Sequence, residues 1–549
     1  MNKLYFPTLL SCLMPLLGLA QWNSNTSINT PACLKIKSQS NLHAVTDGFS
    51  GIIMAWDDNR DTSATLGDVY AQRLDKNGLA KWTLNGVAVC ANQSTQKSSA
   101  IVESNNGSSI ITWADDRNGD FDIYAQKLDS NGNPLWTSGG VALTSSSNTS
   151  KNPKIVVDNS GGAYVVWEDS TNVYYDIYVQ HINSSGANQL GINGLVICNA
   201  NNSQINPKID SDFSGGAIIT WQDKRNGNDY DIYAQRIASG GAVSWAANGV
   251  VICNAVNTQS NPRIEPDGNG GATIAWVDKR SSSNSDIYAQ NINASGAVSW
   301  AANGVVVCNA AGNQSAVDMK FVGTSGTLVS WKDFRNNTYQ IYSQLVNLQG
   351  AVQLAANGIQ LSSGLKAINP NTINSGNGNA IVVWQDSSAA GWDIKAQQIT
   401  NSLTIGWAAG GVIVSNASDN QINATNVSDG IGGAIFAWED RRNGNDYDLY
   451  AHHIDINGMS LVTGEELSYP PTYLKAFPNP ITESNTVLNI STNLKSTSNV
   501  EIFNVFGQRI EKGITNAFGE YTTNTNQLPN GLYNFRINGT QHGSFIIAK

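Results

Sequence analysis

Short stretches of alternating apolar and polar residues recur along most of the chain, and clusters of Gly, Asn and Ser separate them. Asp286–Gln290 alternates strictly, whereas Ala272–Trp276 is rich in β-branched and aromatic residues. Asn248–Cys253 ends in a short apolar run, and Gln259–Ile264 precedes a Gly-rich turn. Each stretch has the length and composition of a β-strand, and none has a sustained helical period. The repeat region is therefore predicted to consist of sets of four short strands.

A tryptophan marks each set of strands and recurs about every 54 residues. Successive tryptophans are 57, 54, 54, 55, 55, 53 and 54 residues apart. They are Trp56, Trp113, Trp167, Trp221, Trp276, Trp331, Trp384 and Trp438. An aspartate follows two residues after each: Asp58, Asp115, Asp169, Asp223, Asp278, Asp333, Asp386 and Asp440. Four antiparallel strands in a unit of this length are typical of a propeller blade.

The predicted fold is all-β: a β-propeller of about eight four-stranded blades with a repeat of about 54 residues, followed by a small C-terminal β-sandwich. The spacing from Cys33 to Gln39 is the same as that from Cys253 to Gln259. The chain therefore starts with a lone fourth strand, which in a closed ring would complete the last blade. Seven blades is the alternative, and Gly464–Ser468 is a possible degenerate ninth unit.

The first twenty residues predict export. Lys3 precedes an apolar run from Leu4 to Leu17, and small residues lead to a cleavage site after Ala20. A membrane anchor is the alternative, but the run is short for a span. We expect a signal peptide at residues 1–20, a propeller at 21–470 and a separate C-terminal domain at 471–549, with no transmembrane segment in the mature chain.

The mature cysteines share one position of the repeat. They are Cys33, Cys90, Cys198, Cys253 and Cys308, and Thr or Ser takes their place in the other units. Equivalent positions on neighbouring blades are expected to be too far apart for disulfides. We therefore predict buried thiols, and with only five histidines in the chain we do not predict a zinc site.

The charge composition argues against nucleic acid as a partner. Charged residues make up 13% of the chain and the formal net charge is -10, with no cluster of Lys and Arg. The sequence therefore lacks the basic footprint of a nucleic-acid-binding protein.

The C-terminal tail departs from the repeat after Pro471. It contains Phe477-Pro-Asn-Pro480, Phe506-Gly-Gln-Arg509, Leu528-Pro-Asn-Gly-Leu-Tyr533 and a terminal Lys549. These phrases resemble the type A C-terminal sorting domain of type IX secretion in Bacteroidetes. The resemblance implies passage across the outer membrane by the type IX machinery, followed by release or attachment at the cell surface. It implies nothing about the activity of the rest of the chain.

Arginine is the most conspicuous candidate for chemistry. It stands four residues after the tryptophan in six units: Arg60, Arg117, Arg225, Arg280, Arg335 and Arg442. Sialidase-like propellers bind a carboxylate with an arginine cluster, but a position repeated in each blade is spread around a ring. We therefore expect structural ion pairs within the hairpins.

Calcium is a second candidate, because oxygen-bearing residues gather in two loops. The first holds Asp223, Asn226, Asn228, Asp229 and Asp231, and the second holds Asp440, Asn443, Asn445, Asp446 and Asp448. Their spacing does not match a known calcium loop, and Asn-Gly is foremost a hairpin turn. No cofactor is therefore assigned, and calcium stays an alternative.

Unrepeated carboxylates and histidines complete the candidates. Glu103, Glu265, Glu465 and Glu466 are unrepeated, but nothing in the sequence places them together. His452 and His453 are adjacent on a predicted strand and should point to opposite faces, which suits packing better than metal binding.

We therefore predict a secreted or cell-surface, non-catalytic binding or adhesion propeller whose ligand is a polysaccharide or a protein. The alternative is a secreted glycan-active hydrolase with a site at the propeller's central mouth. A structural spacer is a third possibility. No catalytic, cofactor-binding or metal residue is assigned, and whether the chain is an enzyme is left open.

Overall fold

The computed structural model describes residues 22–60, 67–105, 107–171, 173–460 and most of 474–548, with short gaps at 478, 480, 483–485, 493–497, 505–507, 517–519 and 538–540. The predicted signal peptide and the possible ninth unit lie outside these residues. Within them, the only helical element is a 3-10 turn, η1 (Gly323–Ser325). None of the described helices is long and apolar enough to cross a membrane.

Each predicted set of strands forms one antiparallel four-stranded sheet, and there are eight such sheets in the repeat region. Blade 1 contains β2 (Gln39–Thr46), β3 (Ile52–Asp58), β4 (Asp68–Leu74) and β5 (Val87–Cys90). Blade 2 contains β6 (Gln96–Glu103), β7 (Ser109–Asp115), β8 (Asp122–Leu128) and β9 (Val141–Ala142). Blade 3 contains β10 (Ser150–Val157), β11 (Ala163–Thr171), β12 (Tyr174–Ile182) and β13 (Leu195–Cys198). Blade 4 contains β14 (Gln204–Ser211), β15 (Ala217–Asp223), β16 (Asp231–Ile237) and β17 (Val250–Cys253).

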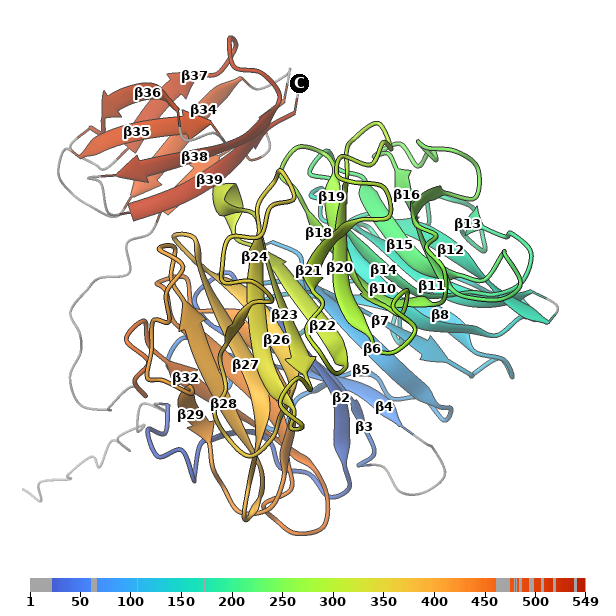
Figure 1. Cartoon of the computed structure of the whole chain (residues 1–549), viewed down its shortest axis with the longest axis vertical. Helices are drawn as coiled ribbons and strands as arrows, with labels where there is room; N and C mark the ends of the chain where they lie inside the picture. The colour runs from blue at the N-terminus through green and yellow to red at the C-terminus, as the bar shows by residue number, and fades with distance from the viewer. Residues whose placement is uncertain are drawn as a thin grey trace, which may run out of the picture.

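The second half of the ring repeats this order (Figure 1). Blade 5 contains β18 (Gln259–Pro266), β19 (Ala272–Asp278), β20 (Asp286–Ile292) and β21 (Val305–Cys308). Blade 6 contains β22 (Gln314–Phe321), β23 (Thr327–Asp333), β24 (Gln340–Val346) and β25 (Ile359–Gln360). Blade 7 contains β26 (Ala367–Gly376), β27 (Asn379–Ser388), β28 (Gly391–Ile399) and β29 (Val412–Ser415). Blade 8 contains β30 (Gln421–Ser428), β31 (Ala434–Asp440) and β32 (Asp448–Ile454). The prediction of an eight-bladed propeller is confirmed.

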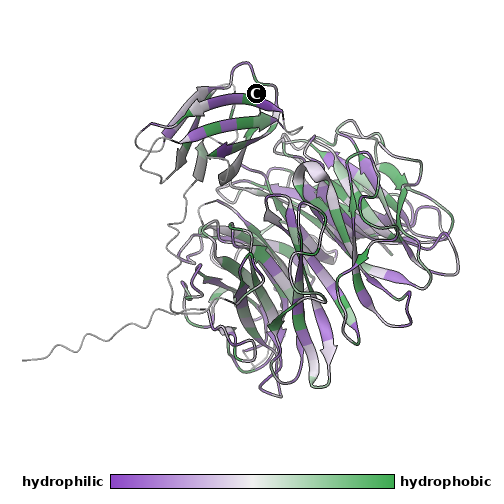
Figure 2. Cartoon of the chain, turned by 60° about the vertical axis from the view of Figure 1, so that its left-hand side comes forward, coloured by the Kyte–Doolittle hydropathy of each residue, from purple (hydrophilic) through white to green (hydrophobic). Residues whose placement is uncertain are grey.

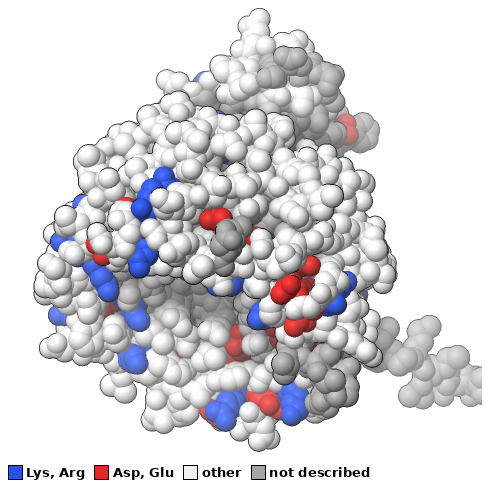
Figure 3. Space-filling model, turned by 90° about the vertical axis from the view of Figure 1, so that its right-hand side faces the viewer, with Lys and Arg blue, Asp and Glu red and all other residues white. Residues whose placement is uncertain are grey.

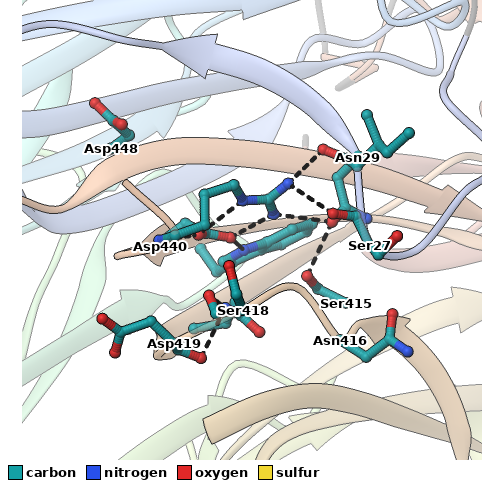
Figure 4. Close-up of polar contacts among 12 residues, drawn as sticks. Ser27, Asn29, Ser415, Asn416, Ser418, Asp419, Asp440 and Asp448 are labelled. Atoms are coloured by element: carbon teal, nitrogen blue, oxygen red, sulfur yellow. Dashed lines mark hydrogen bonds and ion pairs between the residues drawn. The ribbon is translucent and has the colours of Figure 1, made fainter. Parts of the chain in front are cut away.

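The N-terminal strand closes the ring. β1 (Thr30–Cys33) pairs antiparallel with β32 and supplies the fourth strand of blade 8, as the lone fourth strand in the sequence predicted. Just before it, the Asn29 side-chain amide donates to the Val414 carbonyl at 3.0 Å and accepts from the Ser415 hydroxyl at 2.9 Å. Figure 4 shows Asn29 between residues of blades 7 and 8. Residues nearly 400 positions apart are thus joined at one seam.

Apolar side chains of neighbouring blades pack together, as between blades 1 and 2 and between blades 4 and 5. Figure 2 shows the hydropathy of each residue along the strands and loops. The repeated tryptophans are all fully buried. In blade 4, Trp221 lies opposite Tyr233 across the strand pair and packs onto Gly249, where a Cβ atom would meet the ring at 2.4 Å. Gly249 also has a φ of +85°, which L side chains rarely adopt. Glycine is therefore required beside the tryptophan.

Five of the six repeated arginines join neighbouring blades, and Arg442 bonds the segment before β1 instead. Arg225 donates to both carboxylate oxygens of Asp223, at 2.9 and 2.6 Å, and Asp223 also accepts from the Trp221 indole at 2.8 Å. The same guanidinium lies 3.7 Å from the Tyr233 ring centroid and donates to Cys198 of blade 3 at 3.3 Å. All six repeated arginines pair with their aspartates, so the predicted structural role is confirmed.

The cysteines of the repeat are free and buried, as predicted. Each thiol accepts from the arginine of the following blade, at distances from 3.1 to 3.4 Å. Burial raises the pKa of all five to about 12, so these thiols stay protonated and unreactive.

The C-terminal strands form two sheets around a separate core. The first contains β33 (Leu474–Phe477), β34 (Val487–Thr492) and β37 (Glu520–Asn524). The second contains β35 (Asn499–Asn504), β36 (Arg509–Ile514), β38 (Gly531–Ile537) and β39 (Gln541–Ile547). Leu488 and Ile490 from one sheet pack with Ile502, Phe535 and Phe545 from the other, which makes a small β-sandwich.

The contribution of the N-terminal segment before β1 to ring closure can be tested by a stability measurement. Trp22 is 2% exposed, and its indole donates to the Lys76 carbonyl at 2.8 Å. Because a large buried ring is lost, Trp22→Ala should lower the free energy of unfolding of the mature chain by about 3 kcal/mol, measured by urea denaturation. The control is Leu84→Ala, at a residue that is 78% exposed. Equal stability of the two variants would contradict the role of Trp22 in closure.

Candidate functional site

The first strand of each blade lies innermost, and these strands surround the propeller axis. Each contacts the first strand of the next blade, and β30 contacts β2, so the inner ring is closed. Because an innermost strand has one unpaired edge, its inward N–H and C=O groups face the axis. Residues about 54 positions apart are therefore brought to one place. Figure 3 shows one face of the molecule hollowed near its middle, with basic and acidic side chains around the hollow.

The fifth residue of the innermost strand differs from blade to blade. From blade 1 to blade 8 these residues are His43, Ala100, Lys154, Lys208, Arg263, Asp318, Asn371 and Thr425. Three cations thus occupy consecutive blades, and we call Lys154, Lys208 and Arg263 the basic arc. No convergent polar set was expected from the sequence, but the ring of first strands brings these unrepeated side chains together.

The members of the basic arc are half-buried and incompletely neutralised. Lys208 Nζ donates to the Asn206 side-chain oxygen at 2.6 Å, and Lys154 Nζ donates to the Pro153 carbonyl at 3.2 Å. Arg263 Nε lies 3.5 Å from an Asp318 carboxylate oxygen. Among the described residues, no carboxylate lies within 4.0 Å of either lysine, so two of the three cations lack an ion-pair partner.

The electrostatics of the arc reflect burial and mutual repulsion. Burial, followed by the charges of Arg263 and Lys154, holds the pKa of Lys208 well below its usual range. Burial and Arg263 also lower the pKa of Lys154, while Glu168 and Asp57 oppose the shift. An anion placed among these groups would reverse both effects, because it favours the charged form.

A second group of charges lies at the seventh residue of three innermost strands: Asp210 on β14, Glu265 on β18 and Lys320 on β22. Lys320 Nζ donates to Glu265 at 2.9 Å, and the second Glu265 oxygen accepts from the Phe321 backbone N–H at 3.1 Å. Burial raises the pKa of Glu265 to about 7, and it raises the pKa of Asp210. Burial alone would lower the pKa of Lys320, but Glu265 and Asp210 outweigh it, so that pKa lies above its usual value.

Side-chain amides lie two residues before each member of the arc. Asn152, Asn206 and Asn261 have φ values of 54°, 55° and 53°, at an irregularity in the strand register that asparagine tolerates well. Gln222 accepts from the Asn206 side chain and from the Asn261 backbone, both at 2.8 Å, and so links blades 4 and 5. Asn152 and Asn261 are nevertheless exposed.

The loops considered for calcium are held by their own hydrogen bonds. The Asn226 side chain donates to Asp231 at 3.1 Å and accepts from the Asn228 and Asp229 backbones. Burial and the nearby Asp223 raise the pKa of Asp231 to about 6. Nowhere in the described part of the chain do three His, Cys, Asp or Glu side chains gather as a metal site would require.

The other sequence candidates are dispersed. His452 bonds Ser460 and His453 bonds Asp429, each at 2.8 Å, and both histidines are buried on β32, which confirms the packing role. Glu103 ends β6, and burial raises its pKa to about 7. Only Glu265 reaches the axial group, and Glu465 and Glu466 lie outside the described residues.

A cavity of about 290 Å³ lies elsewhere, lined by residues that include His181, Phe213 and Ile546. His181 bonds Asp158 at 2.9 Å, and Arg236 makes the equivalent bond to Asp212 one blade later. Its main polar pair therefore belongs to a repeated structural contact, and we do not assign the site there.

Sequence reasoning missed the basic arc, although a signal exists. Asn-Pro-Lys or Asn-Pro-Arg occurs on three consecutive innermost strands, at Asn152–Lys154, Asn206–Lys208 and Asn261–Arg263. In the equivalent positions of the other blades the third residue is not basic, apart from His43. This difference between blades can be found by aligning the repeats, but its meaning depends on knowing that the innermost strands form a ring.

Lys208 offers a test of these electrostatics. Lys154, Arg263 and Glu168 face it, and its lowered pKa means that the unfolded chain binds more protons at this site. Stability should therefore rise with pH between the folded and unfolded pKa values. Lys208→Met should raise the free energy of unfolding at pH 7 on the order of 1 kcal/mol, a gain that shrinks toward pH 10.

Urea denaturation across this pH range measures the effect, with the exposed Lys279→Met as the control. A gain for Lys208→Met that does not depend on pH would contradict the assigned pKa shift.

Residues 475–548 match the secretion system C-terminal sorting domain. This match confirms the resemblance found in the tail, and it implies secretion or attachment at the cell surface. Comparison with curated proteins found no significant match.

Several solved structures match part of the chain at low identity. A polysaccharide lyase of family PL25, an ulvan lyase, is 9% identical, with a TM-score of 0.42 over 79% of this chain and 97% of that one. The periplasmic gluconolactonase of Pseudomonas aeruginosa is 10% identical, with a TM-score of 0.42 over 69% and 98%. An endo-arabinase from Bacteroides thetaiotaomicron is 13% identical, with a TM-score of 0.27 over 47% and 95%. Similarity at this level says nothing about activity. The chain is a repeat β-propeller protein that carries a type IX secretion C-terminal sorting domain.

Proposed function

We propose that this protein is an extracellular binding propeller that contacts a polysaccharide at the propeller axis. The observation that carries the proposal is the convergence of unrepeated charged side chains on the innermost strands. Lys154, Lys208 and Arg263 come from three consecutive blades, and two of them lack an ion-pair partner among the described residues. Partly exposed polar groups that converge in a concave place are the usual mark of a binding site.

The aspartate and arginine that recur in the blades are poor candidates for ligand binding. Asp223 already accepts hydrogen bonds from Trp221 and Arg225, and it is fully buried. Arg225 donates through Nη2 to Asp223, Asn248 and Cys198 and through Nε to Asp223. A ligand would have to break the contacts between blades to reach these groups. Among the described residues, Lys154 and Lys208 make no ion pair between blades that a ligand would have to break.

A glycan-cleaving enzyme is the second candidate function, and one observation favours it. Burial raises the pKa of Glu265 to about 7, so a fraction of this carboxyl is protonated at neutral pH. A carboxylic acid in this state can donate a proton to a glycosidic oxygen. However, Glu265 accepts hydrogen bonds from Lys320 and from the Phe321 backbone, as a charged carboxylate would. Binding without cleavage is therefore the leading proposal.

The test uses the mature full-length chain on a panel of immobilised neutral and acidic polysaccharides. Retention of the protein and release of reducing ends are measured together. We expect retention without product. Product release that Glu265→Gln abolishes and Glu103→Gln preserves would establish the enzyme instead, since Glu103 has a similarly raised pKa but no ion-pair partner at the axis. Absence of both signals would overturn the proposed function.

A further inference from the structure

We infer that the polysaccharide is acidic, and that the basic arc of Lys154, Lys208 and Arg263 binds its carboxylate or sulfate groups. This inference rests on the proposed function and adds the chemical class of the ligand. The three cations lie at the same position of β10, β14 and β18, on consecutive blades. An anionic group entering the ring from the axis would therefore meet three donors from three strands.

The absence of an ion-pair partner at Lys154 and Lys208, among the described residues, supports an anionic ligand at the arc, even though Glu168 and Asp57 act on Lys154 from beyond 4.0 Å. The chain has a net charge of -10, yet Lys154 and Lys208 lie together with Arg263 and without a carboxylate in contact. Half-buried cations that repel one another are unfavourable unless a counter-charge is supplied. In the part of the chain that the structure describes, the only acid within 4.0 Å of the arc is Asp318, at 3.5 Å from Arg263, and it also accepts from the Thr372 backbone N–H at 2.7 Å. A bound anion would supply the missing charge.

The residues around the arc favour a sugar as the ligand. Each cation is preceded at two residues by an asparagine, and Asn152 and Asn261 are exposed. An amide both donates and accepts, so it can hydrogen-bond sugar hydroxyls beside a charged group. Asn206 is partly engaged, since its side-chain amide lies 2.8 Å from Gln222 and 3.3 Å from Asn261.

Nucleic acid fits this site less well. The innermost strands β10, β14 and β18 carry no aromatic residue on which a base could stack. Three cations also neutralise far fewer phosphates than a binding duplex presents. An acidic polysaccharide, with one charge per sugar and many hydroxyls, matches the alternation of cations and amides more closely.

The experiment measures binding of the mature full-length chain to three soluble polymers by isothermal titration calorimetry. Polygalacturonate carries only carboxylates, dextran sulfate carries only sulfates, and dextran carries no charge. We expect one or both charged polymers to bind and dextran to bind at least tenfold more weakly. The polymer that binds better identifies the anionic group.

Variants then locate the site. Lys154→Gln and Lys208→Gln break no ion pair and should each weaken binding at least tenfold, with a midpoint of thermal unfolding no lower than that of the unsubstituted chain as evidence of folding. Arg263→Gln should act likewise, although it also releases Asp318. The matched control is the triple variant Lys76→Gln, Lys81→Gln and Lys279→Gln, which removes three exposed charges and should bind normally.

The outcomes separate the two proposals. If charged and neutral polymers bind equally, or if the control loses as much affinity as the arc variants, the acidic-ligand inference fails while the binding function survives. If no polysaccharide of the panel binds, the proposed function fails. If a charged polymer binds and only the arc variants weaken it, both stand.

Discussion

The fold depends on one buried carboxylate in each blade. The aspartate two residues after the tryptophan accepts from the indole and, in six blades, from an arginine, which is bidentate in five of them. In five of these blades the arginine also reaches a thiol of the preceding blade. A buried charge is stable only when it is paired and hydrogen-bonded. In the five blades where the arginine reaches a thiol, the group therefore fixes the blade against its neighbour in the closed ring.

This constraint divides the sequence into two kinds of position. Residues that make the repeated contact between blades must recur, so their hydrogen-bonding groups are already occupied by partners within the propeller. Residues at the axis do not make the repeated contact, so they are free to differ between blades, although Arg263 with Asp318 and Glu265 with Lys320 also link blades 5 and 6. The basic arc belongs to the second kind, which is why its residues can be specialised for a ligand without weakening the propeller. The same division explains why Glu265 and Lys320, rather than any repeated pair, form the second axial group.

The fold could be predicted from the sequence because its determinants recur. The spacing of Trp221 from Trp276, repeated along the chain, indicates the blade, and the offset of Cys33 from Gln39 indicates the closing strand. The axial site could not be predicted in the same way. Lys154 and Arg263 are more than 100 residues apart, and their relation to the axis depends on the ring and on the irregular register beside Asn152.

The central claim is that recognition lies at unrepeated axial positions and not on the repeated hairpins. Lysine labelling of the mature chain with acetic anhydride, followed by mass spectrometry, tests it directly with and without polygalacturonate or dextran sulfate. The account predicts that the polymer protects Lys154 and Lys208 while labelling of the exposed Lys76, Lys81 and Lys279 is unchanged. Protection of the exposed lysines, with Lys154 and Lys208 labelled as fast as before, would contradict it.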